Sequence, residues 1–230
     1  MIVSVHLANV GRLRAQRLLL RGLDAAKIPG MSYAEVVFAA QLGNRMPLPQ
    51  PGRIGLIAAW DDDAAIDGFL AGHPFAGYLD GGWHTRLQPL HCFGSWAGLA
   101  GLPAKTLPAD DDEPVAALTL GRLRISRTRA FLKSARPTER DAVGSPDVVA
   151  VTGFGRITPP RLVSTFSIWR NLAAMHEYAF GASGSHQAAV QVDRARPFHR
   201  ESAFIRFRPY ASQGLWDGRD PLAGVAQAAT

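Results

Sequence analysis

The chain has 230 residues, of which 47% are hydrophobic and 19% charged, so it can bury a sizeable core and is not a disordered chain. No apolar run reaches the roughly 18 residues that a membrane-spanning helix needs. The single cysteine, Cys92, excludes an intrachain disulfide. The start also lacks the residue order of a signal peptide, so these features together predict a cytoplasmic protein.

The formal net charge is +6, and almost all of the positive charge comes from arginine. One interpretation is a compositional bias toward Arg and Ala. The functional interpretations are an anionic membrane surface, an acidic protein partner or nucleic acid. No nucleic-acid-binding motif supports the last, so no nucleic-acid partner is expected.

Residues 1–98 are expected to form a first structural half. Hydrophobic spacing and turn residues predict the order β-α-β-β-α-β. The expected elements are a strand at 2–9, a helix at 11–27, a strand at 32–40, a loop at 42–52, a strand at 53–60, a helix from 61–63 to about 78 and a strand at 83–93.

Residues 99–113, with two prolines and an acidic run, are expected to be a linker to a second half at 114–218, which a C-terminal tail at 219–230 follows. The second half repeats the same order. The expected elements are a strand at 114–125, a helix at 126–143 that reaches at least Arg136, strands at 147–157 and 161–169, a helix at 171–190 and a strand at 201–210.

Similar residues recur at the same offsets in the two halves, which predicts an internal duplication. Trp60 and Trp169 are each followed by small, apolar or aromatic residues at offsets of four, five, six and nine, and Pro89 and Pro209 each stand seven residues before a tryptophan. These four tryptophans are expected in the core. Each half then matches the ferredoxin-like unit.

We therefore predict an α+β fold, a duplicated (βαββαβ)2 chain that forms one α/β barrel of the dimeric type within a single chain. A duplicated chain builds the barrel alone, so we expect a monomer, or a dimer through another surface. A large apolar ligand is expected between sheet and helices or inside the barrel.

The histidines show no HExxH motif and no metal-binding spacing with cysteines or carboxylates, which argues against a structural zinc site. His186 lies in a stretch of small residues that would let a flat ligand approach a helix, as an axial haem ligand requires. The alternative is an ordinary surface or hydrogen-bonded histidine. Arg206 and Arg208 share one face of a strand, where one would face a haem propionate or bound oxygen. The alternative is a pair of solvated arginines.

Several segments resemble the spheroidene monooxygenase family of carotenoid biosynthesis. They are IGLIAAWDDDAAIDGFL, LQPL with GSWAG, TFSIW, AAMHEYA, AAV after His186, FIRFRP and GLWDGRDPL. The resemblance implies a haem-dependent oxygenase that inserts oxygen at an allylic carbon of an acyclic carotenoid, with reduced ferredoxin as electron donor. It implies that His186 is the axial ligand of the haem iron with Ala189 beside the haem, and that Arg206 and Arg208 match the family's R-F-R run. His176 and then His199 are the fallback ligands.

The FAAQLG segment at 38–43 departs from the glycine-rich run of that family, which leaves the carotenoid substrate open. Two other functions remain. One is another haem enzyme on the same barrel, such as a peroxidase or dehydratase acting on a smaller substrate; the other is a haem- or lipid-binding protein without catalysis. The basic helices near Arg14 and Arg129 suggest contacts with an acidic ferredoxin or with a membrane surface, so a peripheral membrane location is also considered.

Overall fold

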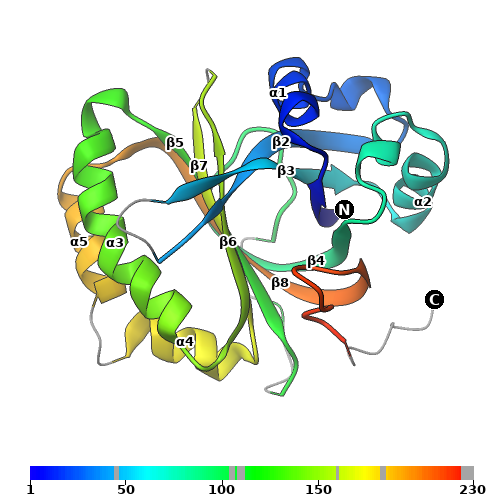
Figure 1. Cartoon of the computed structure of the whole chain (residues 1–230). Helices are drawn as coiled ribbons and strands as arrows, with labels where there is room; N and C mark the ends of the chain where they lie inside the picture. Colours follow the sequence, from blue (N-terminus) through cyan, green and yellow to red (C-terminus); the bar gives the residue numbers. More distant parts are fainter. Residues whose placement is uncertain (44–46, 104–106, 108–111, 159–160, 182–184, 224–230) are drawn as a thin grey trace.

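The computed structural model describes the chain except residues 44–46, 104–106, 108–111, 159–160, 182–184 and 224–230, and the side chains of residues 180, 185–187 and 194–195. It is a closed antiparallel barrel of eight strands with helices outside it (Figure 1). The strands follow the order β1-β3-β2-β6-β7-β5-β8-β4 around the barrel. Their bounds are Ile2–Asn9, Met31–Gln41, Leu48–Trp60, Trp83–Gly94, Val115–Leu123, Val148–Arg156, Leu162–Trp169 and His199–Gly214, for β1 to β8.

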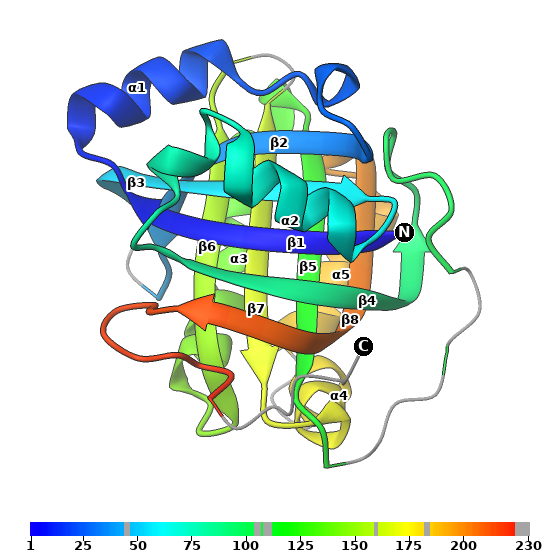
Figure 2. The same cartoon turned by 90° about the vertical axis from the view of Figure 1, so that its right-hand side faces the viewer.

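Four neighbouring strands of the barrel come from each half of the chain. β4-β1-β3-β2 form one group and β6-β7-β5-β8 the other, and the pairs β2–β6 and β4–β8 close the barrel. In Figure 2, strands β1 to β4 run across the view, whereas β5, β6 and β7 run along it. The α+β barrel expected from the sequence is therefore confirmed. The internal duplication and the boundaries of its halves stay a prediction.

The barrel interior is a packed apolar core. Inward side chains such as Val5, Leu118, Phe166 and Phe207 are fully buried, with at most 2% of their surface exposed. At one end, Trp96 donates a 2.9 Å hydrogen bond to the Tyr33 hydroxyl within the same cluster. The expected alternative of a ligand inside the barrel is not supported, because large side chains already fill that volume.

Two helices of the first half are shorter than the sequence predicts. α1 covers Arg12–Arg21 and ends at Gly22, whose φ of 65° suits glycine; a separate 3-10 turn, η1, follows at Ala25–Lys27. α2 covers Asp63–Gly72, and His73 with the following proline ends it, so that only a 3-10 turn continues toward Tyr78.

One predicted loop is partly a strand. β3 begins at Leu48, inside the segment 42–52, although this stretch is rich in proline. Pro49 lies opposite Ala40 on β2, past a register shift between Phe38 and Ala40, where the ladder is irregular. Proline has no backbone N–H to donate, so a strand tolerates it where the hydrogen-bond ladder is irregular.

The helices of the second half also differ from the prediction. α3 spans Thr128–Gly144 and continues through Pro137. The predicted helix at 171–190 is two helices, α4 at Leu172–Phe180 and α5 at Ser185–Ala195. The backbone amide of Gly181 bonds back to the carbonyl of Glu177, which ends α4.

The two repeated tryptophans occupy the same local structure. Trp60 ends β3 and Trp169 ends β7, and both side chains are buried. Two residues later, Asp62 and Asn171 cap the next helix: each side chain accepts a 2.9 Å hydrogen bond from the backbone amide three residues ahead. The predicted core role of the four tryptophans is confirmed, since Trp96 and Trp216 are buried too.

Candidate functional site

The two halves differ most on the outer faces of their sheets. Counted back from Trp60, the outward residues of β3 are Ala58, Leu56 and Ile54, and all are fully buried. Counted back from Trp169, the corresponding residues of β7 are Ser167, Thr165 and Val163, and all are partly exposed. The corresponding outward positions are therefore buried in the first half and partly exposed in the second.

We call the outward side of β5 to β8 the second outer face; its central residues are Ala117, Thr119, Val163, Thr165 and Ser167. Helices α3, α4 and α5 lie over this face in Figure 1. Among the described residues, its buried apolar cluster nevertheless has four members, whereas that of the first half has fifteen. α3 is seventeen residues long, yet only its Ala142 is buried. In the part of the chain that the structure describes, this face therefore buries fewer apolar side chains against its helices than the first half does, a property that ligand-binding layers share.

Arg206 and His176 meet at this layer. Arg206 comes from β8, is only 7% exposed, and its terminal nitrogen lies 3.0 Å from the Nε2 atom of His176 on α4. A guanidinium can only donate, so Nε2 must accept and this imidazole is neutral. Burial, followed by the charge of Arg206, lowers the pKa of His176 and keeps that neutral form.

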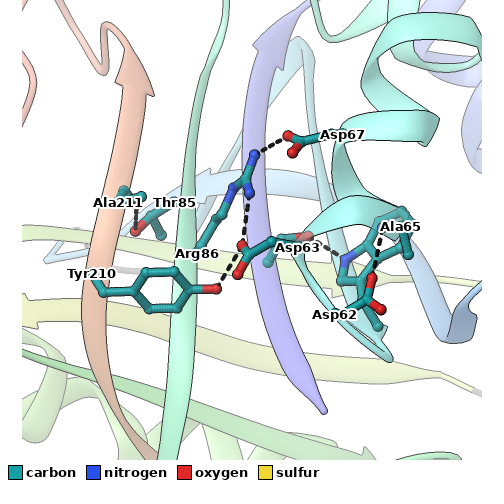
Figure 3. Close-up of polar contacts among 10 residues, drawn as sticks. Asp62, Asp63, Ala65, Asp67, Thr85, Arg86, Tyr210 and Ala211 are labelled. Carbon is teal, nitrogen blue, oxygen red and sulfur yellow. Dashed lines mark hydrogen bonds and ion pairs between the residues drawn. The ribbon is translucent and has the colours of Figure 1, made fainter. Parts of the chain in front are cut away.

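The first half makes the corresponding contact with carboxylates (Figure 3). Arg86 stands three residues before Pro89, as Arg206 does before Pro209, and Asp67 stands seven after Trp60, as His176 does after Trp169. Arg86 binds Asp63 at 2.7 Å and also binds Asp67.

The Tyr210 hydroxyl donates a further 2.9 Å hydrogen bond to Asp63. In the second half, the positions of these two aspartates hold Leu172 and His176, so neither supplies a carboxylate to the arginine.

The predicted pair Arg206 and Arg208 is on one face of β8, but the two guanidinium groups have different surroundings. Arg208 binds Glu113 at 2.9 Å and the Gln88 side chain at 3.2 Å. Arg206 lies next to His176 and over the Phe93 ring, 5.8 Å from its centroid. Burial lowers the pKa of Arg206, although such a group remains charged at neutral pH.

His199 lies at the other end of β8. Its ring is 5.3 Å from that of Phe131 on α3 and covers Gly121, where an added Cβ would come within 2.5 Å of the imidazole. Nδ1 is 3.6 Å from an Asp193 carboxylate oxygen. Burial lowers the pKa of His199 more than this carboxylate raises it. Arg206 lies seven positions further along β8, which puts the backbones of the two residues roughly 23 Å apart at 3.3 Å per residue.

His186 lies in the first turn of α5, but its side chain is outside the described residues. Ala189, the other residue predicted beside the cofactor, is partly buried on the same helix. Helical spacing puts position 186 on the side that carries Ala189, Val190 and Asp193, the half-buried side of α5. The role of His186 therefore stays a prediction.

The sequence interpretation missed two polar groups of α3. The Oε2 atom of Glu139 and the Nε atom of Arg136 are buried and have no hydrogen-bond partner among the described residues. Burial raises the pKa of Glu139 to about 7, although the charge of Arg136 acts in the opposite direction. Helical spacing on an amphipathic helix was the only signal for them, and it does not distinguish a solvated face from a covered one.

The described residues contain neither a metal-binding cluster nor a membrane-spanning helix. No group of three or more His, Cys, Asp or Glu side chains in that part of the chain is arranged to hold a metal ion. Within the same residues, none of the helices has the length and apolar character needed to cross a bilayer.

Comparison with known proteins gives relatives along most of the chain, although no family model matches it. The spheroidene monooxygenase of Cereibacter sphaeroides is 30% identical over 220 residues, 93% of this chain and 65% of that protein. The spheroidene monooxygenase of Rubrivivax gelatinosus is 31% identical over 83% of this chain and 73% of that protein. That of Rhodobacter capsulatus is 32% identical over 73% of this chain and 71% of that protein. The chain thus spans somewhat less than two thirds of the Cereibacter relative.

Solved structures show the same fold at low sequence identity. A crystal structure of aldoxime dehydratase is 9% identical, with a TM-score of 0.59, and covers 99% of this chain and 88% of its own. A second aldoxime dehydratase, crystallised with butyraldoxime, is 10% identical with a TM-score of 0.56, and the match covers 90% of this chain and 79% of that one. At this identity the likeness concerns the fold alone.

Proposed function

The chain belongs to the spheroidene monooxygenase family, and on that premise we propose that it is a haem-dependent monooxygenase acting on a long apolar polyene such as an acyclic carotenoid. The relatives named above support the reaction class. The observation that supports the assignment of the site is the second outer face, which helices cover (Figure 1) and on which Val163, Thr165 and Ser167 stay partly exposed.

The residues around this layer fit haem. Ala117, Thr119 and Ser167 are small, so a flat macrocycle can approach the sheet, and the layer is bounded by helices that carry histidines. Haem, when bound, supplies the iron at which oxygen is activated. His186 would be its axial ligand. His176 is a poorer candidate, because its Nε2 lone pair already accepts from Arg206.

Arg206 would position an anionic group at the layer. It is a buried cation whose helix-borne neighbour is a neutral histidine, whereas Arg86, in the corresponding place, is bound by two carboxylates. A haem propionate is the anion that this arrangement would accept, through charge-assisted hydrogen bonds. His176 would fix the guanidinium in place. Arg208 is less suited to this role, because Glu113 already pairs with it.

Apolar residues of the sheet and the helices would exclude water from the carbon that is oxidised. Monooxygenation places one oxygen atom of O2 in a C–H bond and reduces the other to water, which consumes two protons and two electrons. A ferredoxin-type donor would supply the electrons. An apolar wall of helix and sheet residues, such as Val163 and Val190, would keep the polyene apart from solvent.

Haem titration of the purified protein tests the cofactor. We expect a Soret band with one haem per chain, loss or a strong shift of that band in His186→Ala, and little change in His199→Ala or His176→Ala. Circular dichroism would confirm that each variant is folded. A protein that takes up no haem, or an unchanged His186→Ala spectrum, contradicts the assignment of the ligand.

Turnover tests the reaction. The haem-loaded protein would be incubated with an acyclic carotenoid, reduced ferredoxin and 18O2, and the product analysed by mass spectrometry. We expect one labelled oxygen atom per product. Haem binding without labelled product would favour a haem enzyme with a smaller substrate, or a haem-binding protein without catalysis.

A further inference from the structure

Helix α1 presents two leucines directly away from the protein. Leu13 and Leu20 are 73% and 76% exposed, the two highest values among the large hydrophobic residues. They are seven residues apart, nearly two full turns, and so lie above one another on the helix. Ala15 and Leu18, which pack on the sheet, occupy the opposite side of α1. An apolar ridge of this kind on a surface helix marks an interaction site.

Arginines flank this ridge. Arg12, Arg14, Arg17 and Arg21 are all exposed, and the helix has no acidic residue. None of the four forms an ion pair with another described residue, although Arg53, Arg86, Arg122, Arg156 and Arg208 all do. Their charge is thus available to an anionic partner.

A neighbouring turn extends the surface. Ile157 directly follows β6 and is 71% exposed. The C-terminal end of β6, which Ile157 follows, lies at the same end of the molecule as α1 in both Figure 1 and Figure 2. Leu215, another exposed leucine, belongs to the turn after β8, which lies away from that end in both views.

We propose that α1 docks the protein on an anionic lipid bilayer, with Leu13 and Leu20 inserted among the acyl chains and the flanking arginines on lipid phosphates. Amphipathic helices that lie in the membrane interface combine these two features. A soluble acidic protein would account for the arginines but not for two leucines that point away from the fold. α3 is a poorer candidate, because Glu139 and Asp141 interrupt its positive charge and Arg127 and Arg136 are half-buried.

Vesicle sedimentation tests the proposal without turnover or haem, so its failure is separate from failure of the proposed function. We expect binding to vesicles that contain phosphatidylserine, weak binding to pure phosphatidylcholine, and release at high salt. Leu13→Ser/Leu20→Ser should weaken binding roughly tenfold or more, and each of Arg14→Gln and Arg17→Gln about fivefold. Leu215→Ser and the α3 variant Lys133→Gln are matched controls that should bind as wild type.

Three outcomes would overturn the proposal. The first is a wild-type protein that stays in the supernatant with phosphatidylserine vesicles at low salt. The second is equal loss of binding in the control variants, which would indicate a diffuse charge effect. The third is an unchanged affinity of the leucine variant while the arginine variants lose binding to ferredoxin, which would make α1 a docking site for an acidic protein. Each leucine is largely exposed, so the variants should fold, as circular dichroism would confirm.

Discussion

Filling the second outer face should separate haem binding from folding. Thr165 stands four residues before Trp169, and Leu56 stands four residues before Trp60, so the two side chains occupy corresponding places on β7 and β3. Leu56 is fully buried and Thr165 is partly exposed beneath the helices. Replacement of each by phenylalanine places the same ring in both layers, although the gain in volume is larger at Thr165 than at Leu56.

The expected free energies of unfolding differ between the two variants. Leu56→Phe forces a larger ring into a packed cluster, which costs about 1–3 kcal/mol. Thr165→Phe loses the hydroxyl contact with Thr119, about 1 kcal/mol, and regains a similar amount because the new ring buries apolar surface. Its stability should therefore stay within about 1 kcal/mol of wild type, while its ring would occupy the place proposed for haem.

Urea unfolding and haem titration would be measured on the same preparations. Thr165→Phe should unfold near the wild-type midpoint and lose the Soret band, whereas Leu56→Phe should unfold earlier and keep the band. Equal destabilisation of the two variants would mean that the second layer is already filled. A stable Thr165→Phe protein with normal haem uptake would place the haem elsewhere.

Two further predictions concern the first half. His6 is 1% exposed, and burial, then the charges of His84 and Arg86, lower its pKa well below 6.5, so stability should fall as the pH drops below about 6.5, where the unfolded chain gains a proton that the folded chain excludes. His6→Gln should show a smaller decrease in unfolding free energy between pH 7 and pH 5 than wild type. Glu139 acts in the opposite direction, but equally in both proteins, so its effect cancels in the comparison. An equal dependence of unfolding free energy on pH in the two proteins would contradict the assignment to His6. Arg86→Ala should cost about 1–3 kcal/mol because Asp63 loses a partly buried charged partner, whereas Lys27→Ala, which breaks an exposed pair with Asp24, should cost at most about 0.5 kcal/mol; equal effects on urea unfolding would refute the ranking.

Strand positions were predictable because most strands here are apolar runs bounded by turn residues. β1 agrees with the predicted range to the residue, and β4 to within one residue. The helix ends were harder, since they depend on backbone geometry and tertiary packing. Gly22 stops α1 with a positive φ, while Pro137 fails to stop α3, and no local pattern distinguishes the two outcomes.

The candidate site was only partly predictable. The shared face of Arg206 and Arg208 follows from the two-residue period of a strand. Their different partners do not, because Glu113 and His176 are 95 and 30 residues away in sequence. The role of His186 rests on resemblance alone, and helical spacing on α3 does not show that Glu139 and Arg136 are buried.

The contrast between the halves explains why a repeated chain would hold one site. The tryptophans and capping residues are alike in the two halves, whereas the residues between sheet and helices differ. Leu56 fills the first layer, and Asp67 binds Arg86 with a carboxylate. At the corresponding positions, Thr165 is partly exposed and His176 contacts Arg206 through a neutral imidazole. A pattern search detects what the halves share, which is the framework. The proposed function rests on the residues that differ between the halves, and only the structure shows that these residues lie between sheet and helices.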